Sequence, residues 1–351
     1  METKINIRSL DKSELKSFLI SIGEKPFRAS QIYDWMWKKG VSYFPEMRNL
    51  PKPLIEKLSE KFVIHKLSVD DSQKSNDGTL KSAFRLFDGN VVEGVLIPTK
   101  HRTTACISTQ VGCSLSCAFC ATGKLGRIRN LSADEIYDQV VEIADQSKKQ
   151  YQSNLGNIVY MGMGEPLLNY KETLRSIEMI TSEDGLGMSP RRITVSTAGI
   201  AKMIKKLGDD AVKFNLAVSL HAATDAKRSA IMEINKENSL ESLSEALRYF
   251  HDKTGSRITF EYILFRDFND SLDDAAQLAR FCRAFPVKIN LIEYNPVDGV
   301  EFKKSIPERT DEFAKFLEEK NMIVNVRRSR GKDIDAACGQ LANKNKAFNK
   351  D

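Results

Sequence analysis

Between residues 104 and 327, short apolar segments with strand character alternate with amphipathic segments that have the period of a helix. The strand-like segments include NIVYMGM at 157–163, ITFEYIL at 258–264 and VKINLIEYN at 287–295. Strands this apolar are buried on both faces, and repeated strand–helix units join into a parallel sheet through right-handed crossovers. About seven strand candidates fall in this range, which predicts an α/β fold with a partial (β/α) barrel.

The first 98 residues do not show this alternation. Helical periodicity interrupted by prolines at 12–60 predicts a small helical domain. Short alternating runs at 61–98, with the turn sequence Asp88-Gly89-Asn90, predict β-hairpins. The predicted organisation is therefore a helical accessory domain at 1–60, a β-hairpin linker at 61–98, the barrel core at 99–330 and a C-terminal loop with a basic tail at 331–351.

Composition excludes several classes of protein. The chain has 351 residues, of which 41% are hydrophobic and 28% are charged, so it can bury a core. No segment approaches the ~18 consecutive apolar residues of a membrane span, and the N-terminal segment lacks the apolar block of a signal peptide. We therefore expect a cytoplasmic protein with no membrane partner. The net charge of +6 alone does not indicate a nucleic-acid partner.

Four of the six cysteines fall within residues 106–120. In a long chain without a secretory signal, this clustering indicates metal or redox chemistry rather than a disulfide framework. The motif Cys113-x3-Cys117-x2-Cys120 follows a predicted strand, and three thiolates on one loop can bind three irons of a [4Fe–4S] cluster and leave the fourth open. A structural zinc site is an alternative, but such a site uses four ligands, usually in two pairs, and no second pair is present. Buried free cysteines are the third interpretation.

With this spacing the chain resembles the radical S-adenosylmethionine (SAM) enzymes, in which the open iron binds SAM and an electron from the cluster cleaves SAM to a 5′-deoxyadenosyl radical. Phe119 matches the aromatic position before the last cysteine. The segment YMGMGEP at 160–166 matches the site for the SAM amino group, where glycines let the backbone approach the ligand and Glu165 accepts from the ammonium. The resemblance implies one [4Fe–4S] cluster per chain and assigns the SAM contacts to Gly164, Glu165, Ser196, Ser219, Leu220, His221 and Asn295.

The resemblance narrows to the RlmN/Cfr family, which methylates an adenine carbon in RNA. The sequence PLL after Glu165 is typical of the RlmN branch, which implies methylation at C2 of an adenosine in the peptidyl transferase centre of 23S rRNA and of the adenosine 3′ to the anticodon in tRNAs. The matching segments span nearly the whole chain: residues 23–41, 105–123, 129–136, 161–170, 189–200, 216–228, 289–296 and 333–341.

The chemistry of the target is consistent with this resemblance. An adenine C2–H is neither acidic nor nucleophilic, so a carbon radical has to be delivered to it. By resemblance, Cys338 takes a methyl group from one SAM, as a nucleophilic thiolate can, and the radical from a second SAM activates that methyl group. Cys106 then forms a transient disulfide with Cys338 and releases the product. Glu93 aligns with the proposed proton acceptor, although periodicity alone would make it a solvent-facing strand residue.

Basic residues that could contact RNA phosphates fall in three regions, although a solvated surface is the ordinary explanation for such residues. The target adenine would have to be turned out of its stack and into the barrel. The expected partners are 23S rRNA, tRNA and an electron donor such as flavodoxin or ferredoxin, and the expected state is a monomer. The candidates are Lys25, Arg28, Lys38 and Lys39, then residues 124–129, then Arg327, Arg328, Arg330 and Lys332.

Two other functions remain open from the sequence. A Cfr-like enzyme that methylates C8 of an adenine in rRNA and confers antibiotic resistance would use the same residues. A non-catalytic RNA-binding protein with an iron–sulfur cluster or zinc would keep Cys113, Cys117 and Cys120, but it would not need Cys106, Cys338 or the glycine-rich segment.

Overall fold

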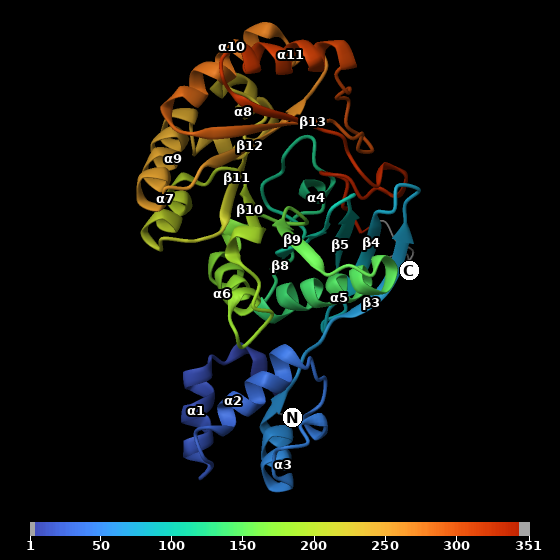
Figure 1. The fold of residues 1–351 in the computed structure, drawn as a ribbon, viewed down its shortest axis with the longest axis vertical. Helices are drawn as coiled ribbons and strands as arrows, with labels where there is room; N and C mark the ends of the chain where they lie inside the picture. Colours follow the sequence, from blue (N-terminus) through green and yellow to red (C-terminus); the bar gives the residue numbers. More distant parts are fainter. Residues whose placement is uncertain (1–3, 344–351) are drawn as a thin grey trace.

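The computed structural model describes residues 4–343, which form a small helical domain at the N-terminus and a large α/β domain (Figure 1). The core of the large domain is a sheet in which seven parallel strands lie in the order of the sequence. These strands are β6 (Thr103–Cys106), β9 (Leu155–Tyr160), β10 (Ile193–Thr197), β11 (Asn215–Ser219), β12 (Ile258–Leu264), β13 (Val287–Glu293) and β14 (Ile323–Arg327).

Three antiparallel strands extend this sheet at β6. They are β3 (Ser68–Lys74), β4 (Leu80–Arg85) and β5 (Val91–Pro98), and β5 pairs with β6 with Val95 opposite Cys106. The full order is β14-β13-β12-β11-β10-β9-β6-β5-β4-β3, so β14 and β3 are the two edges of an open sheet. The prediction of an α/β partial barrel is confirmed. The boundary predicted at Pro98 falls at the last residue of β5, inside this sheet.

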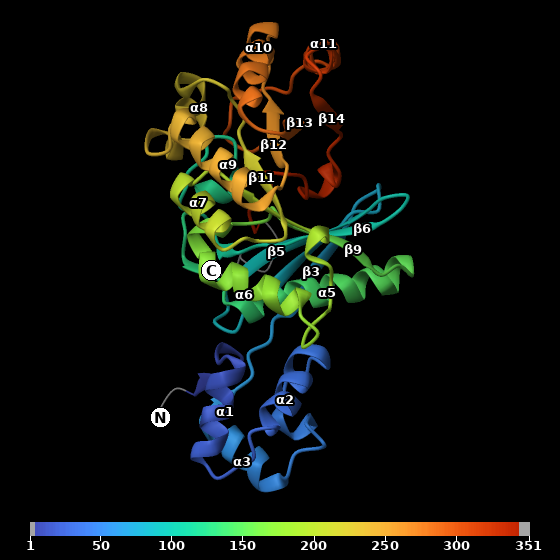
Figure 2. The same cartoon turned by 60° about the vertical axis from the view of Figure 1, so that its left-hand side comes forward.

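Helices cover the outside of the curved sheet (Figure 2). Local sequence fixes their ends: Ser132 and Glu135 form a capping box at the start of α5, and Gly255 ends α9 in a left-handed conformation. The helices are α5 (Ala133–Tyr151), α6 (Tyr170–Thr181), α7 (Ala201–Asp209), α8 (Asp225–Ile231), α9 (Leu240–Thr254), α10 (Leu272–Phe281) and α11 (Pro307–Glu319).

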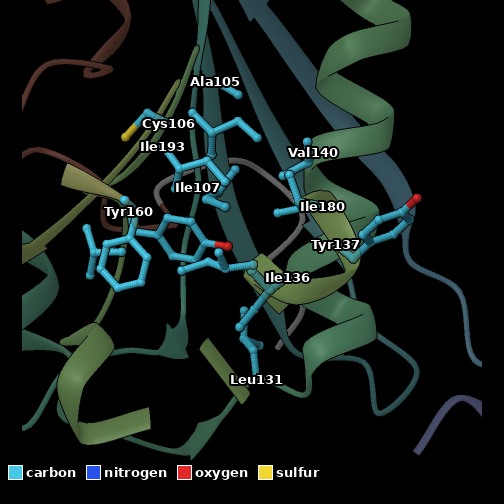
Figure 3. Packing of buried hydrophobic residues seen from close by; sticks show 14 of the residues in the cluster. Ala105, Cys106, Ile107, Leu131, Ile136, Tyr137, Val140, Tyr160, Ile180 and Ile193 are labelled. Atoms are coloured by element: carbon cyan, nitrogen blue, oxygen red, sulfur yellow. The ribbon is translucent and has the colours of Figure 1, made fainter. Parts of the chain in front are cut away.

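The layer between the sheet and α5 shows how the alternation of side chains along β6 positions Cys106. Ala105 and Ile107 are fully buried in the same apolar core as Ile136 and Val140 of α5. The sulfur of Cys106 points away from α5 (Figure 3), because successive side chains of a strand face opposite sides of the sheet. Cys106 therefore faces the inside of the partial barrel.

The small N-terminal domain contains α1 (Lys12–Ser21), α2 (Arg28–Tyr33), the π-helical segment Asp34–Lys38 and α3 (Lys52–Lys61), and its short strands β1 (Ile5–Asn6) and β2 (Phe62–Val63) pair with each other. It lies against α5 and α6 at one end of the large domain (Figure 1). No helix within residues 4–343 is long and apolar enough to cross a membrane. The end of the predicted basic tail, residues 344–351, lies outside the described residues.

A buried charge holds the two domains together. Arg8 is fully buried and donates two hydrogen bonds of 2.8 Å to Asp138 of α5, while its guanidinium lies 4.4 Å from the centre of the Trp37 ring. Arg175 of α6 donates 2.8 Å hydrogen bonds to three successive main-chain carbonyls, those of residues 8–10. Bidentate pairing of a buried arginine gives a defined geometry, so the small domain has a fixed orientation on the large one.

Candidate active site

A cavity of about 230 Å³ lies at the carboxyl ends of the parallel strands, where a barrel of this kind places its chemistry. Residues from the ends of all seven parallel strands contribute to its wall, together with a loop after β6 and a segment near the C-terminus. Ten of the predicted site residues line it: Cys106, Cys113, Cys117, Cys120, Gly164, Glu165, Ser196, Ser219, His221 and Cys338.

The three clustered cysteines lie on residues 112–120, here called the cysteine loop, between β7 (Gln110–Val111) and α4 (Ala121–Lys124). Backbone hydrogen bonds fix this loop: Cys113 N–H donates to the Gly126 carbonyl at 3.1 Å, and Ala118 N–H donates to the Ile231 carbonyl at 2.9 Å. Gly112 has φ +74°, and a Cβ atom there would lie 1.7 Å from the Gly126 oxygen. The close packing of two main-chain segments therefore requires glycine at position 112.

The three thiols are close enough to influence one another. Burial raises the pKa of Cys113 to about 11, and the neighbouring thiol of Cys120 contributes. Burial also raises the pKa of Cys117, followed by the charges of Cys120 and Cys113. Because three such thiolates repel one another, they are stable together only when a cationic group compensates their charge.

The donor set fits an iron–sulfur cluster better than a single ion. A structural zinc site needs four ligands about 2.0–2.3 Å from one centre, and within residues 4–343 no three His, Cys, Asp or Glu side chains are arranged to hold one metal ion. A cubane cluster takes one thiolate at each of three separate irons. Cys113, Cys117 and Cys120 could hold such a cluster at the wall of the cavity.

A fixed carboxylate lies in the same cavity wall. Glu165 follows the glycine-rich segment after β9, and its two carboxylate oxygens accept hydrogen bonds from the N–H groups of Leu167 at 3.0 Å and Ala198 at 2.7 Å. Burial raises the pKa of Glu165, and these hydrogen bonds oppose that effect. Gly164 has φ +95°, and a Cβ atom there would lie 2.5 Å from the Cβ of Gln110. The segment thus offers an oriented acceptor for a cationic ligand.

His221 is neutral and has a defined tautomer. Its Nδ1 atom accepts a hydrogen bond from the Ile263 N–H at 3.0 Å, so its proton is on Nε2. Burial, together with the charge of Arg228, lowers the pKa of His221 to about 3. The ring packs edge-on against Phe119 with the ring centres 4.9 Å apart. His221 can therefore donate one hydrogen bond to a ligand in the cavity.

Arg228 is a structural residue of the site that the sequence did not reveal. It is fully buried and donates to the carbonyls of Ala198 at 2.5 Å and Leu220 at 3.2 Å, and to the side chain of Asn235 at 2.7 Å. Burial lowers its pKa to about 10. In the sequence it resembles an ordinary surface residue of a helix, because its partners are mostly main-chain oxygens that no motif encodes. It joins the residues that follow β10 and β11, and one of them, Ala198, lines the cavity.

The two cysteines outside the loop meet at this cavity. Cys106 is buried at the end of β6, whereas Cys338 has an exposed side chain, and both thiols are free. Burial raises the pKa of Cys106 to about 12, and the nearby Cys338 contributes in the same direction. The protein groups around Cys338 also raise the pKa of its thiol, by desolvation of the thiolate, although the residue is accessible to solvent; the charge of Arg327 lowers that pKa. Two thiols that are 232 positions apart in the sequence thus line one cavity.

Residues 328–343, here called the C-terminal strap, carry Cys338. Arg328 and Lys332 each lie 2.7 Å from a carboxylate oxygen of Glu293, at the end of β13. Burial alone would raise the pKa of Glu293, but hydrogen bonds from Lys332, Arg328 and Lys304 outweigh it and lower the pKa to about 2. One end of the strap is therefore held by an ionised carboxylate.

Two further carboxylates attach the strap to the turn before β4, one from the turn and one from the strap. Asp77 accepts from the Gly331 N–H at 3.0 Å and lies 3.0 Å from Nε of Arg330. Burial would raise the pKa of Asp77, but hydrogen bonds from Thr79 and from the Gly331 N–H outweigh it and lower the pKa to about 2. Asp333 of the strap accepts from Asn76 N–H at 3.0 Å.

Three predicted site residues do not line the cavity: Glu93, Leu220 and Asn295. The expectation from periodicity that Glu93 faces solvent is wrong, because Glu93 is fully buried. Its Oε2 atom accepts from the N–H groups of Ala342 at 2.9 Å and Asn343 at 3.0 Å. The side-chain amide of Asn295 donates to the Cys338 carbonyl at 3.4 Å. Both residues therefore contact the strap.

Several predicted RNA contacts are already paired within the protein. Lys124 donates to the carbonyls of Asp298 and Gly299, and Arg129 forms ion pairs with Asp88 and Glu135. Arg327, Arg328 and Arg330 line the cavity together with Cys106 and Cys338.

Comparison with known proteins agrees with these observations. Residues 5–64 match the model of the ribosomal RNA large subunit methyltransferase N-terminal domain, and residues 107–281 match that of the radical SAM superfamily. A probable dual-specificity RNA methyltransferase RlmN from Christiangramia forsetii is 54% identical over 98% of this chain and 97% of its own length. The dual-specificity RNA methyltransferase RlmN of an Anaeromyxobacter species is 44% identical over 97% of this chain and 91% of its own length.

A solved structure agrees over the whole fold. The crystal structure of a radical SAM methyltransferase from Sphaerobacter thermophilus has a TM-score of 0.89 and 39% identity, and the match covers 96% of this chain and 99% of that one. The [FeFe]-hydrogenase maturase HydG matches with a TM-score of 0.51 at 11% identity over 68% of this chain and 55% of its own length, which is a likeness of fold alone.

Proposed function

We propose, since this chain belongs to the RlmN family of dual-specificity radical SAM RNA methyltransferases, that it methylates C2 of an adenosine in 23S rRNA and of the adenosine 3′ to the anticodon in tRNAs. The observation that carries this proposal is that Cys106 and Cys338 line the same cavity as Cys113, Cys117 and Cys120. A reaction in the cytoplasm, with electrons from flavodoxin or ferredoxin, is part of the proposal.

Within this proposal, Cys113, Cys117 and Cys120 hold one [4Fe–4S] cluster. With SAM bound to it, the cluster supplies a 5′-deoxyadenosyl radical. Glu165 and Gly164 orient the SAM amino group, and His221 offers its Nε2–H to the same ligand. The further SAM contacts in the proposal are Ser196, Ser219, Leu220 and Asn295.

The remaining roles belong to residues of this chain. Cys338, on the strap, accepts a methyl group on sulfur and presents it to the base. Cys106 lines the same cavity and attacks the Cys338 sulfur, so that a disulfide forms as the bond between this sulfur and the transferred carbon breaks and the product leaves. The family resemblance gives Glu93 the role of proton acceptor. Of Cys338, Cys106 and Glu93, only Glu93 does not line the cavity.

The test is product mapping with the reconstituted enzyme. Anaerobic reconstitution with iron and sulfide, then incubation with SAM, a reductant and either a 23S rRNA fragment or tRNA, should give 2-methyladenosine by mass spectrometry. A methyl group at C8 would instead indicate the Cfr-like reaction. A protein that binds RNA without forming 5′-deoxyadenosine would support the non-catalytic alternative, which gives no reason for Cys106 and Cys338 to line one cavity.

A further inference from the structure

Strand β4 carries a buried lysine that has no role in the function proposed above. Lys81 is only 2% exposed, and the ion pair that it makes within the described residues is with Glu93 of β5. Its Nζ atom lies 3.4 Å from Oε1 of that glutamate. An ammonium group is costly to remove from water unless an opposite charge compensates it. The position of Lys81 is therefore explained either by the fold alone or by a task at the carboxylate beside it.

The sheet register places Lys81 and Glu93 on the face that Cys106 occupies. Ala83, two residues after Lys81, lies opposite Glu93. Val95, two residues after Glu93, lies opposite Cys106. Residues two apart on a strand share a face, and so do residues directly opposite each other on neighbouring strands. Because Cys106 faces the inside of the partial barrel (Figure 3), the side chains of Lys81 and Glu93 lie on that side of the sheet too.

The two carboxylate oxygens of Glu93 have different surroundings. Oε2 accepts hydrogen bonds from the main-chain N–H groups of Ala342 and Asn343 in the strap, at 2.9 and 3.0 Å. Oε1 is buried and accepts no hydrogen bond within residues 4–343, although Nζ of Lys81 lies beside it. The strap therefore occupies one oxygen, and the other, next to the ammonium group, is left to take a proton.

A buried carboxylate can act as a base only while it is ionised, and burial favours its neutral form. Glu93 is surrounded by the ammonium group of Lys81 from β4, by Cys106 on the same face of β6, and by the two N–H groups of the strap. The Glu93 N–H donates to the sulfur of Met163 at 3.4 Å. Among these groups, only Lys81 carries a positive charge.

We propose that Lys81 is a positioning residue for Glu93, an inference that rests on the proposed function. Its ammonium group compensates the charge of the buried carboxylate, so that Glu93 is ionised when the transferred carbon is bonded to the RNA base. The C–H bond at the target carbon then breaks. Its proton goes to Oε1 of Glu93, and its electron pair remains in the ring. Lys81 keeps its own protons and acts only through Glu93.

The experiment follows single turnovers of the reconstituted enzyme over a range of pH, on RNA that carries deuterium at the target carbon. Lys81→Met keeps the length of the side chain but removes its charge. The acidic limb of the rate of release of methylated RNA should move upward by about 1–3 pH units, because loss of a neighbouring cation disfavours the ionised form of a carboxylate. Below the displaced limb, a protein–RNA adduct that retains deuterium should accumulate. Above it, the release rate should return toward that of the wild type.

Three controls separate this role from a structural one. Bound iron, methylation of Cys338 and formation of 5′-deoxyadenosine do not depend on this proton transfer, so they should be unchanged in Lys81→Met. Lys81→Arg restores the charge and should return the acidic limb toward its wild-type position. Ser82→Ala is the matched variant and should not move the limb, because Ser82 is the next residue of β4 and its hydroxyl hydrogen-bonds with Ser72 and with Gln146 of α5, on the other face of the sheet.

A second neutral variant, Lys81→Gln, can donate a hydrogen bond to Oε1 and serves if the methionine variant does not fold. An acidic limb at its wild-type position in either folded neutral variant would overturn the inference. So would an equal displacement in Ser82→Ala, or a displacement in Lys81→Arg as large as in Lys81→Met. Loss of 5′-deoxyadenosine formation in both neutral variants would also overturn it, because the defect would then precede the proton transfer.

The same measurements distinguish this inference from the proposed function. Wild-type enzyme that places the methyl group at C8 rather than C2 contradicts the proposed function, and deuterium at C8 then tests Lys81 at that carbon. Wild-type enzyme that makes 2-methyladenosine while Lys81→Met has the wild-type pH–rate profile contradicts the inference alone.

Discussion

The cysteine loop and the C-terminal strap both bring sulfur to one cavity, but different forces hold them. Main-chain hydrogen bonds and glycine packing fix the loop, whereas Asp77, Glu93 and Glu293 hold much of the strap. A cluster site has to keep one geometry through every cycle. The methyl carrier that we propose for the strap has to be methylated and then reach RNA. Electrostatic attachments can weaken and form again without unfolding of the core.

The sharpest way to test this contrast is to remove a sulfur from the loop. Cys113→Ala, Cys117→Ala or Cys120→Ala should each lose bound iron and all SAM cleavage, because a cubane held at two irons has lost one of its three protein ligands. Iron analysis and 5′-deoxyadenosine assays measure both. Full iron content with normal SAM cleavage in any of these variants would refute the ligand assignment.

Removing a sulfur from the strap should have a narrower effect. Cys338→Ala should keep iron and fold but give neither methylated protein nor methyladenine, because the nucleophile is absent. Cys106→Ala should still acquire the methyl group and stall with RNA attached through Cys338. A denaturing gel after incubation with SAM, reductant and a 23S rRNA fragment shows the attached species. An RNA adduct in the Cys338 variant, or normal product release by the Cys106 variant, would contradict these roles.

Weakening the attachments of the strap should have a smaller effect. Asp77→Asn and Glu293→Gln should lower the rate of RNA methylation about ten- to a hundredfold, because small displacements of a reacting group are costly, and should leave iron content unchanged. Hydrogen exchange should be faster at residues 328–343 only. Asp70→Asn is the matched control, because Asp70 pairs with Arg85 of β4 instead of the strap. Equal effects in the control would show that the strap is not specifically involved.

The smallest expected effect is that of pH: acid should destabilise the C-terminal strap before it destabilises the cysteine loop. The pKa values of Glu293 and Asp77 are lowered to about 2 from the ordinary values of 4.5 for glutamate and 3.8 for aspartate. Their contribution to the stability of the strap is fully present above the unfolded-state pKa values. It is lost as the pH falls from those pKa values toward 2. Pepsin should therefore cut the strap increasingly over this range before it cuts the cysteine loop. Cleavage of the strap and the cysteine loop at the same pH would contradict the conclusion that different forces hold the two segments.

The sequence predicts those parts of the site that are formed by residues close together in the chain, because their spacing forms a motif. The spacing of Cys113, Cys117 and Cys120 indicates a cluster site without knowledge of the fold, and the alternation after residue 104 predicts the parallel strands in their order. Cys338 came from resemblance, because a lone cysteine in a loop has no local signature. The pairing of β5 with β6 and the burial of Glu93 depend on contacts with distant segments, which periodicity cannot show.

Glu261, which is buried and lines the cavity, lies between residues with a local sequence signal and residues whose place depends on distant contacts. Its signal was present in the sequence as an acid within the buried strand ITFEYIL, but an isolated acid does not indicate which cavity it faces. The register with Asn290 and Asn325 supplies that information. Arg228 gave no comparable signal, because its partners include the carbonyls of Ala198 and Leu220.

The buried pairing of Arg8 with Asp138, together with the three carbonyls held by Arg175, has a consequence for target choice. These contacts fix the orientation of the small domain on the large one, so they also set the distance between the small domain and the cavity. If the small domain binds one part of the RNA, an unpaired adenosine can enter the cavity only when it lies at a fixed distance from that bound part. The RNA is then selected by this distance. Two RNAs of unrelated sequence can then both be substrates if this distance is the same in each, which gives dual specificity a geometric basis.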